Sequence, residues 1–149
     1  MSAPYNLFLG RIPRKFGIFV DEKKMLKKTE EVLAELNIET VQNLIGPISE
    51  MSGGQQQSIA IGRAIAWGKD IVILDEPTAA LGPNETLEVE RIIREIRKRG
   101  TAIILISHNL DQVFRVADRL VVVHKGITSR EFLRSEVTLE ELVKSITTG

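Results

Sequence analysis

Two short segments of the sequence contain residues that could bind and hydrolyse a phosphate compound. The first, Ser52-Gly53-Gly54-Gln55, precedes a run typical of a helix. The start of a helix offers free backbone N–H groups and a partial positive charge. The two glycines would let the backbone approach an anion closely, and the Ser52 hydroxyl would add a donor. A plain helix cap with a flexible glycine pair is the alternative explanation of the same residues.

The second segment is an apolar strand, 71–74, followed by the adjacent carboxylates Asp75 and Glu76. In phosphoryl-transfer sites a carboxylate at a strand end holds Mg²⁺, and Asp75 suits that role. The next residue, Glu76, would orient or deprotonate the attacking water. A strand end exposed at a loop, where two carboxylates cost little, is the alternative. Together the two segments predict one half of a nucleotide-hydrolysing site.

A histidine follows the next apolar strand, 102–106, as part of the pair Ser107-His108. Neighbouring parallel strands end at the same edge of a sheet, which is where open α/β sheets bind ligands. We therefore expect His108 to lie near the carboxylates and to donate to a terminal phosphate. A capped, structural imidazole is the alternative.

The other half of such a site, a glycine-rich loop of the form G-x-x-x-x-G-K-[ST], does not occur in these residues. The nearest candidate runs from Gly62 to Gly68-Lys69, but it has five residues between its glycines and Asp70 in place of Ser or Thr. It also falls inside an expected helix. Because the loop supplies most of the grip on a nucleotide, we do not expect the chain to hydrolyse nucleotide by itself.

The elements that must position these residues follow from periodicity and capping. A helix over 52–67 should begin with a Ser52/Gln55 capping box, and a helix from Pro83 should bury one apolar face. The strand expected over 71–75 has an unbroken apolar run at 71–74, which predicts that it is buried on both faces. Helices and strands alternate, which predicts an α/β fold with parallel strands. The remaining expectations are an irregular loop over 1–21, a helix over 22–36, a connection over 37–51, a helix over 110–117, a strand over 120–123 and a helix from Thr138.

Composition excludes several classes of protein. The 149 residues carry 20 basic and 20 acidic side chains, so nothing in the overall charge suggests binding to nucleic acid. There is no cysteine, and therefore no disulfide or thiolate metal site. The amino end does not resemble a secretion signal, and no apolar run approaches the roughly 20 residues of a membrane-spanning helix. We expect a cytosolic protein whose contact with a membrane is made through a partner.

Taken together, these residues resemble the ATP-binding subunit of ABC transporters. Met51 to Gln55 is similar to the signature sequence of that family, with Met in place of the usual Leu, and Ile71 to Glu76 is similar to its Walker B strand. The resemblance implies that Asp75 is the magnesium-water ligand, that Glu76 is the catalytic base and that His108 is the switch histidine. Residues 79–82 resemble the D-loop, with Gly82 in place of the usual Asp.

A finer resemblance, to simple-sugar importers of the ribose and fructose type, runs along essentially the whole chain. It implies a partial P-loop NTPase fold, in which a parallel sheet with helices is joined to a helical signature subdomain. Residues 1–149 would then be an incomplete nucleotide-binding domain, with the signature subdomain at about 1–67 and the Walker B and switch-histidine part at about 68–149. The Walker A loop and the glutamine loop of the family would lie upstream of Met1. We also expect the chain alone to be marginally stable, or to pair its open sheet edge with another copy.

The resemblance implies an ATP-hydrolysing, energy-coupling component of a sugar importer, with ATP and Mg²⁺ as cofactors. Its partners would be a second ABC ATPase domain, packed head to tail, and a transmembrane permease at the inner face of the cell membrane. Two alternatives stay open for a chain without Walker A: a non-catalytic module that donates its signature helix in trans, or an inactive remnant. An ABC ATPase that acts on nucleic acid is disfavoured by the balanced charge and the lack of cysteines and coiled-coil insertions.

Overall fold

The computed structural model describes residues 1–68 and 70–148, and its contacts divide the chain into two compact units. The first unit is Met1–Ile104 and the second is Leu105–Gly149. We describe each unit separately. This division does not test the subdomain boundary expected near residue 67, which stays a prediction.

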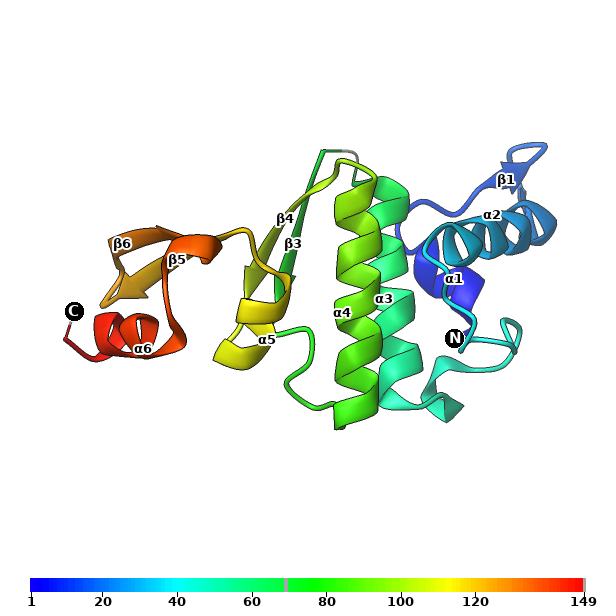
Figure 1. Ribbon diagram of the computed structural model, residues 1–149. Helices are drawn as coiled ribbons and strands as arrows, with labels where there is room; N and C mark the ends of the chain where they lie inside the picture. Colours follow the sequence, from blue (N-terminus) through cyan, green and yellow to red (C-terminus); the bar gives the residue numbers. More distant parts are fainter. Residues whose placement is uncertain (69, 149) are drawn as a thin grey trace. The chain divides into compact units, whose positions relative to one another are not determined.

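The first unit is built on helices that pack against one another along their lengths (Figure 1). Helix α3 lies beside α4 and also contacts α1 and α2. In α2 and α4 the buried side chains recur at spacings of three and four residues, so each of these two helices presents one buried face. The bounds of the helices are α1 (Ala3–Leu7), α2 (Glu22–Glu35), the short 3₁₀ turn η1 (Ile48–Glu50), α3 (Gly53–Trp67) and α4 (Pro83–Lys98).

Two pairs of strands accompany these helices. Strands β1 (Arg14–Lys15) and β2 (Phe19–Val20) form a small antiparallel hairpin. Strands β3 (Ile71–Asp75) and β4 (Ala102–Ile106) form a second two-stranded sheet. The Ala102 N–H donates to the Asp70 carbonyl over 2.9 Å, which joins the beginnings of β3 and β4, so these two strands run in the same direction, as expected.

The predicted irregular loop over 1–21 was wrong, because it contains α1 and the β1–β2 hairpin. Helix α1 is short, but tertiary contacts fix it. The Trp67 indole N–H donates to the Leu7 carbonyl over 2.8 Å, and the Phe8 and Trp67 rings meet edge to face with centroids 5.2 Å apart. Trp67 thus packs at the end of α3, where Gly68 caps the helix.

The prediction that β3 is buried on both faces was also wrong. Val72 and Leu74 are buried, but Ile71 and Ile73 on the opposite face are 58% and 63% exposed. The apolar run identified the strand correctly. Among the more extensive contacts of the described residues, α3 is the only helix that packs against β3. One helix covers one face of the strand, and the other face is left exposed.

The second unit is an antiparallel hairpin with helices packed beside it. Strand β5 pairs with β6 through partners such as Leu120 and Phe132, with an irregularity between Val122 and Val123. Strand β6 was not predicted, and β5 therefore belongs to an antiparallel pair and not to a parallel one. The core of this unit is Leu120, Val122, Val137 and Leu142. Its elements are α5 (Leu110–Val116), β5 (Arg119–His124), β6 (Ile127–Leu133), η2 (Arg134–Glu136) and α6 (Leu139–Thr148).

Candidate functional site

The start of α3 is held by the capping box that the sequence predicted. The Ser52 hydroxyl accepts a hydrogen bond from the Gln55 N–H over 3.3 Å, and the Gln55 side chain accepts one from the Ser52 N–H over 2.9 Å. The Gln55 amide also donates to the Thr40 carbonyl over 2.7 Å. Because both ends of Gln55 are engaged, the turn over residues 52–55 has a fixed geometry before any ligand binds.

A carboxylate that the sequence analysis did not assign to the site lies directly against this turn. Glu85, in the first turn of α4, accepts a hydrogen bond from the Gly54 N–H over 3.1 Å through one oxygen. Its other oxygen accepts one from the Gly82 N–H over 3.2 Å. A single side chain therefore satisfies backbone donors at the beginnings of two helices, where a negative charge is favoured by both dipoles.

These contacts lower the pKa of the Glu85 carboxyl below its usual value. The Gly54 N–H has the largest effect, followed by the Gly82 N–H and the Ser52 hydroxyl. Each of these hydrogen bonds stabilises the charged form of the acid. Glu85 is thus held as an anion at neutral pH, and the start of α3 already binds one negatively charged group.

The two glycines of the turn meet different surroundings. Gly54 is buried, and a Cβ atom added there would lie 2.9 Å from Cγ of Glu85. Gly53 is exposed, and an added Cβ would lie 3.1 Å from a methyl group of Leu81. Glycine at position 54 therefore lets α4 approach the helix start, while Gly53 leaves open backbone toward solvent.

The carboxylates predicted at the end of β3 are adjacent and belong to the same unit as the turn. Asp75 is the last residue of β3 and is exposed, and Glu76 follows with a left-handed φ of 46°. Non-glycine residues adopt this conformation rarely, and it is concentrated at functional sites. The following segment turns through a hydrogen bond from the Leu81 N–H to the Thr78 carbonyl over 3.1 Å, and Leu81 then reaches Gly53.

His108 belongs to the second unit, so its closeness to Asp75 and Glu76 stays a prediction. It is exposed and stands between a strand and a capped helix. Asn109 caps α5 by accepting from the Gln112 N–H over 3.1 Å, and the Ser107 hydroxyl accepts from the Asn109 N–H over 3.1 Å. These bonds fix the backbone on both sides of the histidine.

The carboxylate at the end of β3 suits a magnesium ion whose other ligands are water and a phosphate. Within residues 1–68 and 70–148, no group of three or more acidic, histidine or cysteine side chains could hold a metal ion by itself. Mg²⁺ is usually bound through one or two carboxylates, with water and substrate phosphate completing its octahedron. In this pattern Asp75 would be the carboxylate ligand, as the sequence predicts, and Glu76 would be left to act on the attacking water.

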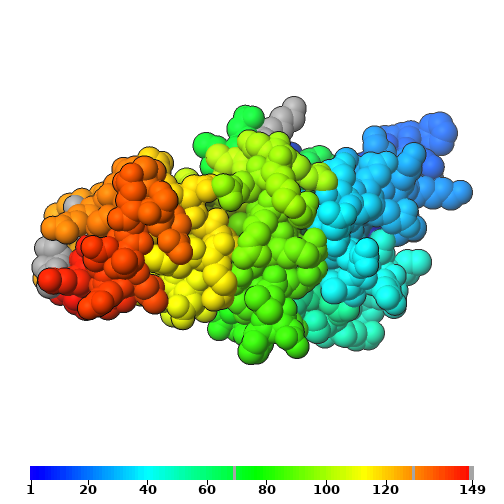
Figure 2. Space-filling model, in the orientation of Figure 1, coloured from blue at the N-terminus to red at the C-terminus, as the bar shows by residue number. Residues whose placement is uncertain are grey.

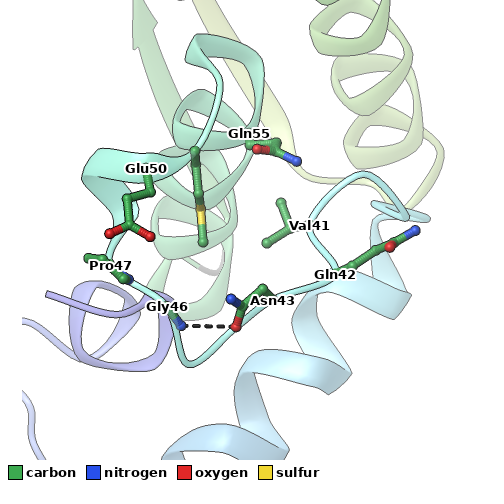
Figure 3. Close-up of a pocket in the computed structure, with 8 residues that line it drawn as sticks. Val41, Gln42, Asn43, Gly46, Pro47, Glu50 and Gln55 are labelled. Carbon is green, nitrogen blue, oxygen red and sulfur yellow. Dashed lines mark hydrogen bonds between the residues drawn. The ribbon is translucent and has the colours of Figure 1, made fainter.

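A hollow of about 160 Å³ lies beside the start of α3 (Figure 3). The connection before the helix forms most of its wall, and the Gly46 N–H donates to the Asn43 side chain over 3.0 Å at its edge. Its charged lining residue is Glu50, which disfavours an anion. Gln55, one of the residues predicted to contact phosphate, lines this hollow, whereas Ser52 and Gly53 do not.

The segment from Gly62 to Gly68, which was considered and rejected as a phosphate-binding loop, begins inside helix α3 as predicted. Gly62 lies inside α3 and packs against Val32, Leu33 and Leu7. Lys69 lies outside the described residues.

Comparison with known families decides what these elements form. A family model described as ABC transporter matches residues 8–79, which include the turn at the start of α3 and both carboxylates. The chain belongs to the ABC transporter ATP-binding family. That the turn at the start of α3 is the signature of this family, and that β3 with Asp75 and Glu76 is its Walker B segment, stay predictions from the sequence.

Several relatives of this ABC transporter chain are named as sugar import ATP-binding proteins. A fructose import ATP-binding protein from Rhizobium meliloti is 44% identical over 132 residues, covering 85% of this chain and 51% of the relative. A xylose/arabinose import ATP-binding protein from Sulfolobus acidocaldarius is 33% identical, covering 96% of this chain and 56% of the relative. A galactose/methyl galactoside import protein from Clostridium perfringens is 34% identical, and 26% of its length is covered. The chain thus spans about half or less of the relatives' lengths.

Solved ABC transporter structures confirm the fold class. A nucleotide-free ATP-binding cassette matches with a TM-score of 0.77 at 24% identity, covering 100% of this chain and 60% of that one. A transporter of the metal-chelate type in an inward-facing conformation matches with a TM-score of 0.80 at 21% identity, covering 99% of this chain and 58% of that one. At these identities the likeness concerns the fold alone.

The sequence contained only a weak signal for Glu85. The residue stands three positions after Gly82, the spacing at which a glutamate caps its own helix, and this part could be read directly. Its bond to Gly54, 31 residues away, depends on how α4 packs against α3. No periodicity within either helix predicts that contact.

Proposed function

We propose that this chain is part of the ATP-binding, ATP-hydrolysing subunit that powers an ABC importer of a simple sugar. The names of the fructose, xylose/arabinose and galactose relatives support the substrate class. One structural observation carries the proposal. Leu81 and Glu85 connect the segment that follows Glu76 to the turn at the start of α3, so the two segments with predicted phosphate chemistry belong to one packed unit.

In this proposal each residue has a distinct task. Asp75 would hold Mg²⁺, and Glu76 would orient or deprotonate the attacking water. A bound magnesium ion would neutralise charge on the phosphates. Ser52, Gly53, Gly54 and Gln55 shape the turn that faces the terminal phosphate, and His108 donates a hydrogen bond to it.

The Glu85 contact refines how a phosphate would approach. Its carboxylate already accepts from the Gly54 N–H, so that donor serves the turn itself. A phosphate would instead meet the exposed side of the turn, at Ser52 and Gly53. The negative charge of Glu85 on the other side then limits the anion to that one direction of approach.

The partners follow from the same proposal. A second ABC ATPase domain would face the turn at the start of α3, and a transmembrane permease subunit would receive the work of hydrolysis. In the described part of the chain, no helix has the length and apolar character needed to cross a bilayer. We propose that the subunit works at the cytoplasmic face of the membrane on such a permease.

The decisive experiment replaces Glu76 in an assembly that also contains a phosphate-binding loop, since these residues include none. Glu76→Gln should retain binding of Mg²⁺-ATP and lower hydrolysis by about a hundredfold or more, because general-base catalysis is lost while the fold is unchanged. Glu30→Gln, an exposed carboxylate of α2, is the matched control and should hydrolyse normally. Undiminished hydrolysis by Glu76→Gln would remove this residue from the role of base.

Donation of the turn in trans is a second candidate function, and the preformed geometry of residues 52–55 favours it. A chain acting in this way needs the turn but not its own nucleotide loop. Hydrolysis should then appear only when a complete ATPase subunit is added, and Ser52→Arg should abolish the gain by blocking the turn. Tight ATP binding by the chain alone would contradict the expectation that the grip on the nucleotide comes from outside these residues, and no effect on the partner would indicate an inactive segment.

A further inference from the structure

We propose that the β1–β2 hairpin and the first half of α2 form a surface that binds anionic lipid at a membrane. We call this surface, residues 11–28, the basic hairpin surface. It lies in the first unit and is independent of the nucleotide chemistry proposed above. The hairpin and α2 are drawn in blue tones in Figure 1, and Figure 2 shows the hairpin standing out from the helices beside it.

The tip of the hairpin is apolar and exposed. Phe16 is 94% exposed, Ile18 is 76% exposed and Phe19 is 68% exposed. Large apolar side chains gathered on one protruding turn mark an interaction site more often than scattered single ones do. An aromatic ring beside an aliphatic chain is the composition that enters the boundary between lipid headgroups and acyl chains.

The backbone at the tip adds a second argument. Phe16 and Gly17 both have left-handed φ angles, 51° and 74°, and the Ile18 N–H closes the turn on the Lys15 carbonyl over 3.2 Å. Glycine, asparagine and aspartate adopt this conformation most readily, and a bulky aromatic residue does so at a cost. Phe16 therefore occupies a position that backbone energetics and solvation both disfavour, which indicates a role outside the fold.

The charge around this tip is mainly positive. Residues 11–28 contain seven basic and two acidic side chains, a local charge of +5 in a chain whose net charge is zero. Lys15 pairs with Asp21 over 3.4 Å, and Lys28 with Glu31 over 3.5 Å. In the described part of the chain, the lysines 23, 24 and 27 form no ion pair within 4 Å and are exposed.

Not all of the lysines of α2 help to stabilise the helix that carries them. The helix start is stabilised by the capping Asp21 and by Glu22, but Lys23 and Lys24 also lie in the first turn, where the dipole disfavours positive charge. The exposed lysines alternate with the buried face of Met25 and Thr29, so they are directed to solvent.

An anionic membrane satisfies these features together. Lipid headgroups complement the positive charge, and the acyl boundary takes up Phe16 and Ile18. Nucleic acid would complement the charge and could stack on the two phenylalanines, but it offers no apolar environment to Ile18, whereas the acyl boundary of a membrane accommodates all three side chains. The geometry therefore points to lipid as the partner of the basic hairpin surface.

Co-sedimentation with vesicles tests the proposal on the full chain. Binding should be clear with vesicles that contain one third phosphatidylglycerol, weak with pure phosphatidylcholine, and reduced at about 0.5 M NaCl, where the screening length falls below ~5 Å. The double variant Phe16→Ser/Phe19→Ser should bind about tenfold more weakly, because it removes the apolar insertion. The triple variant Lys23→Gln/Lys24→Gln/Lys27→Gln should lose most of the salt dependence.

Two controls keep the test specific. Ile45→Ser changes an equally exposed apolar residue outside the surface and should bind as the parent chain does. Phe16→Trp should shift its added emission to shorter wavelength on the anionic vesicles but not on the neutral ones. Equal binding to both kinds of vesicle, or unchanged binding by the Phe16→Ser/Phe19→Ser variant, would overturn the proposal. So would an RNA oligonucleotide that binds more tightly than the vesicles and displaces them.

Discussion

Helix α4 and strand β3 each carry a row of apolar side chains beside the candidate site, yet these side chains are covered to different extents. Val89, Ile92, Ile93 and Ile96 of α4 are all buried against neighbouring helices. Strand β3 buries Val72 and Leu74 but exposes Ile71 and Ile73. An amphipathic helix needs one partner and finds it within the first unit, whereas a strand that is apolar on both faces needs two layers.

The difference shows what the described residues can stabilise unaided. Helices α3 and α4 pack against each other, and Glu85 adds hydrogen bonds to the backbone at the start of both helices. The outer face of the β3–β4 sheet, including Ile104, is open. We therefore expect the helical side to tolerate substitution poorly and the outer sheet face to tolerate it well.

The sharpest test exchanges one isoleucine on each side. Ile92→Ala should lower the free energy of unfolding by about 2–5 kcal/mol, because it leaves a cavity in a packed helix interface. Ile73→Ala should change it by less than about 0.5 kcal/mol, as is usual for exposed positions. Urea denaturation followed by circular dichroism measures both values. Equal losses for the two variants would mean that the outer face of β3 is covered in solution.

A second test concerns the tight approach of α4 to α3. Gly54→Ala should cost about 1–3 kcal/mol, because the new methyl group would overlap Cγ of Glu85 at 2.9 Å. Gly53→Ala should cost less, since the methyl group of Leu81 that it would meet can rotate away. Thermal unfolding of each variant, and of Gly54→Ala/Glu85→Ala, provides the measurement. If the double variant is no more stable than Gly54→Ala, the side chain of Glu85 is not what prevents a larger residue at position 54.

A third test removes the cap of α3. Ser52→Ala should lower stability by about 1 kcal/mol, because the Gln55 N–H loses its acceptor and the capping box opens. Ser52→Thr retains the hydroxyl and should recover most of the loss. Urea midpoints of the two variants decide the matter. A loss in Ser52→Thr as large as that in Ser52→Ala would assign the effect to packing.

The smallest expected effect is a dependence on pH. The pKa of Glu85 is lowered in the folded chain by the Gly54 N–H, the Gly82 N–H and the Ser52 hydroxyl. The folded state therefore binds this proton less readily than the unfolded state, so Glu85 contributes stability at pH values above its unfolded pKa. That contribution is lost as the pH falls through the folded pKa. Glu85→Gln should flatten the acid limb of a plot of urea midpoint against pH, and an unchanged limb would contradict the assignment.

Local patterns in the sequence predicted the elements whose partners are close or whose periodicity is complete. The stripe of Val89, Ile92, Ile93 and Ile96 identified the buried face of α4, and the Ser52/Gln55 box identified the start of α3. Asp75 and Glu76 were identified as adjacent carboxylates after a strand, and the structure has them in those positions.

The missed features are those for which the local sequence carries a weak signal or none. Helix α1 is only five residues long and depends on Trp67, 60 residues away from Leu7. Strand β6 has a largely polar sequence, and its hairpin turns at Lys125 and Gly126, a pair less diagnostic than Asn-Gly. The uncovered face of β3 could not be inferred either, because an apolar run indicates what a strand needs and not which layers are present.

Glu85 has a mechanical consequence beyond its effect on stability. Its two carboxylate oxygens hold Gly54 on one side and Gly82 on the other, so neither loop can shift without pulling on the same planar group. A displacement that begins just after the last strand residue, near Glu76, would thus be transmitted to the mouth of α3 through one side chain. The positions of the two turns are therefore coupled through the carboxylate of Glu85.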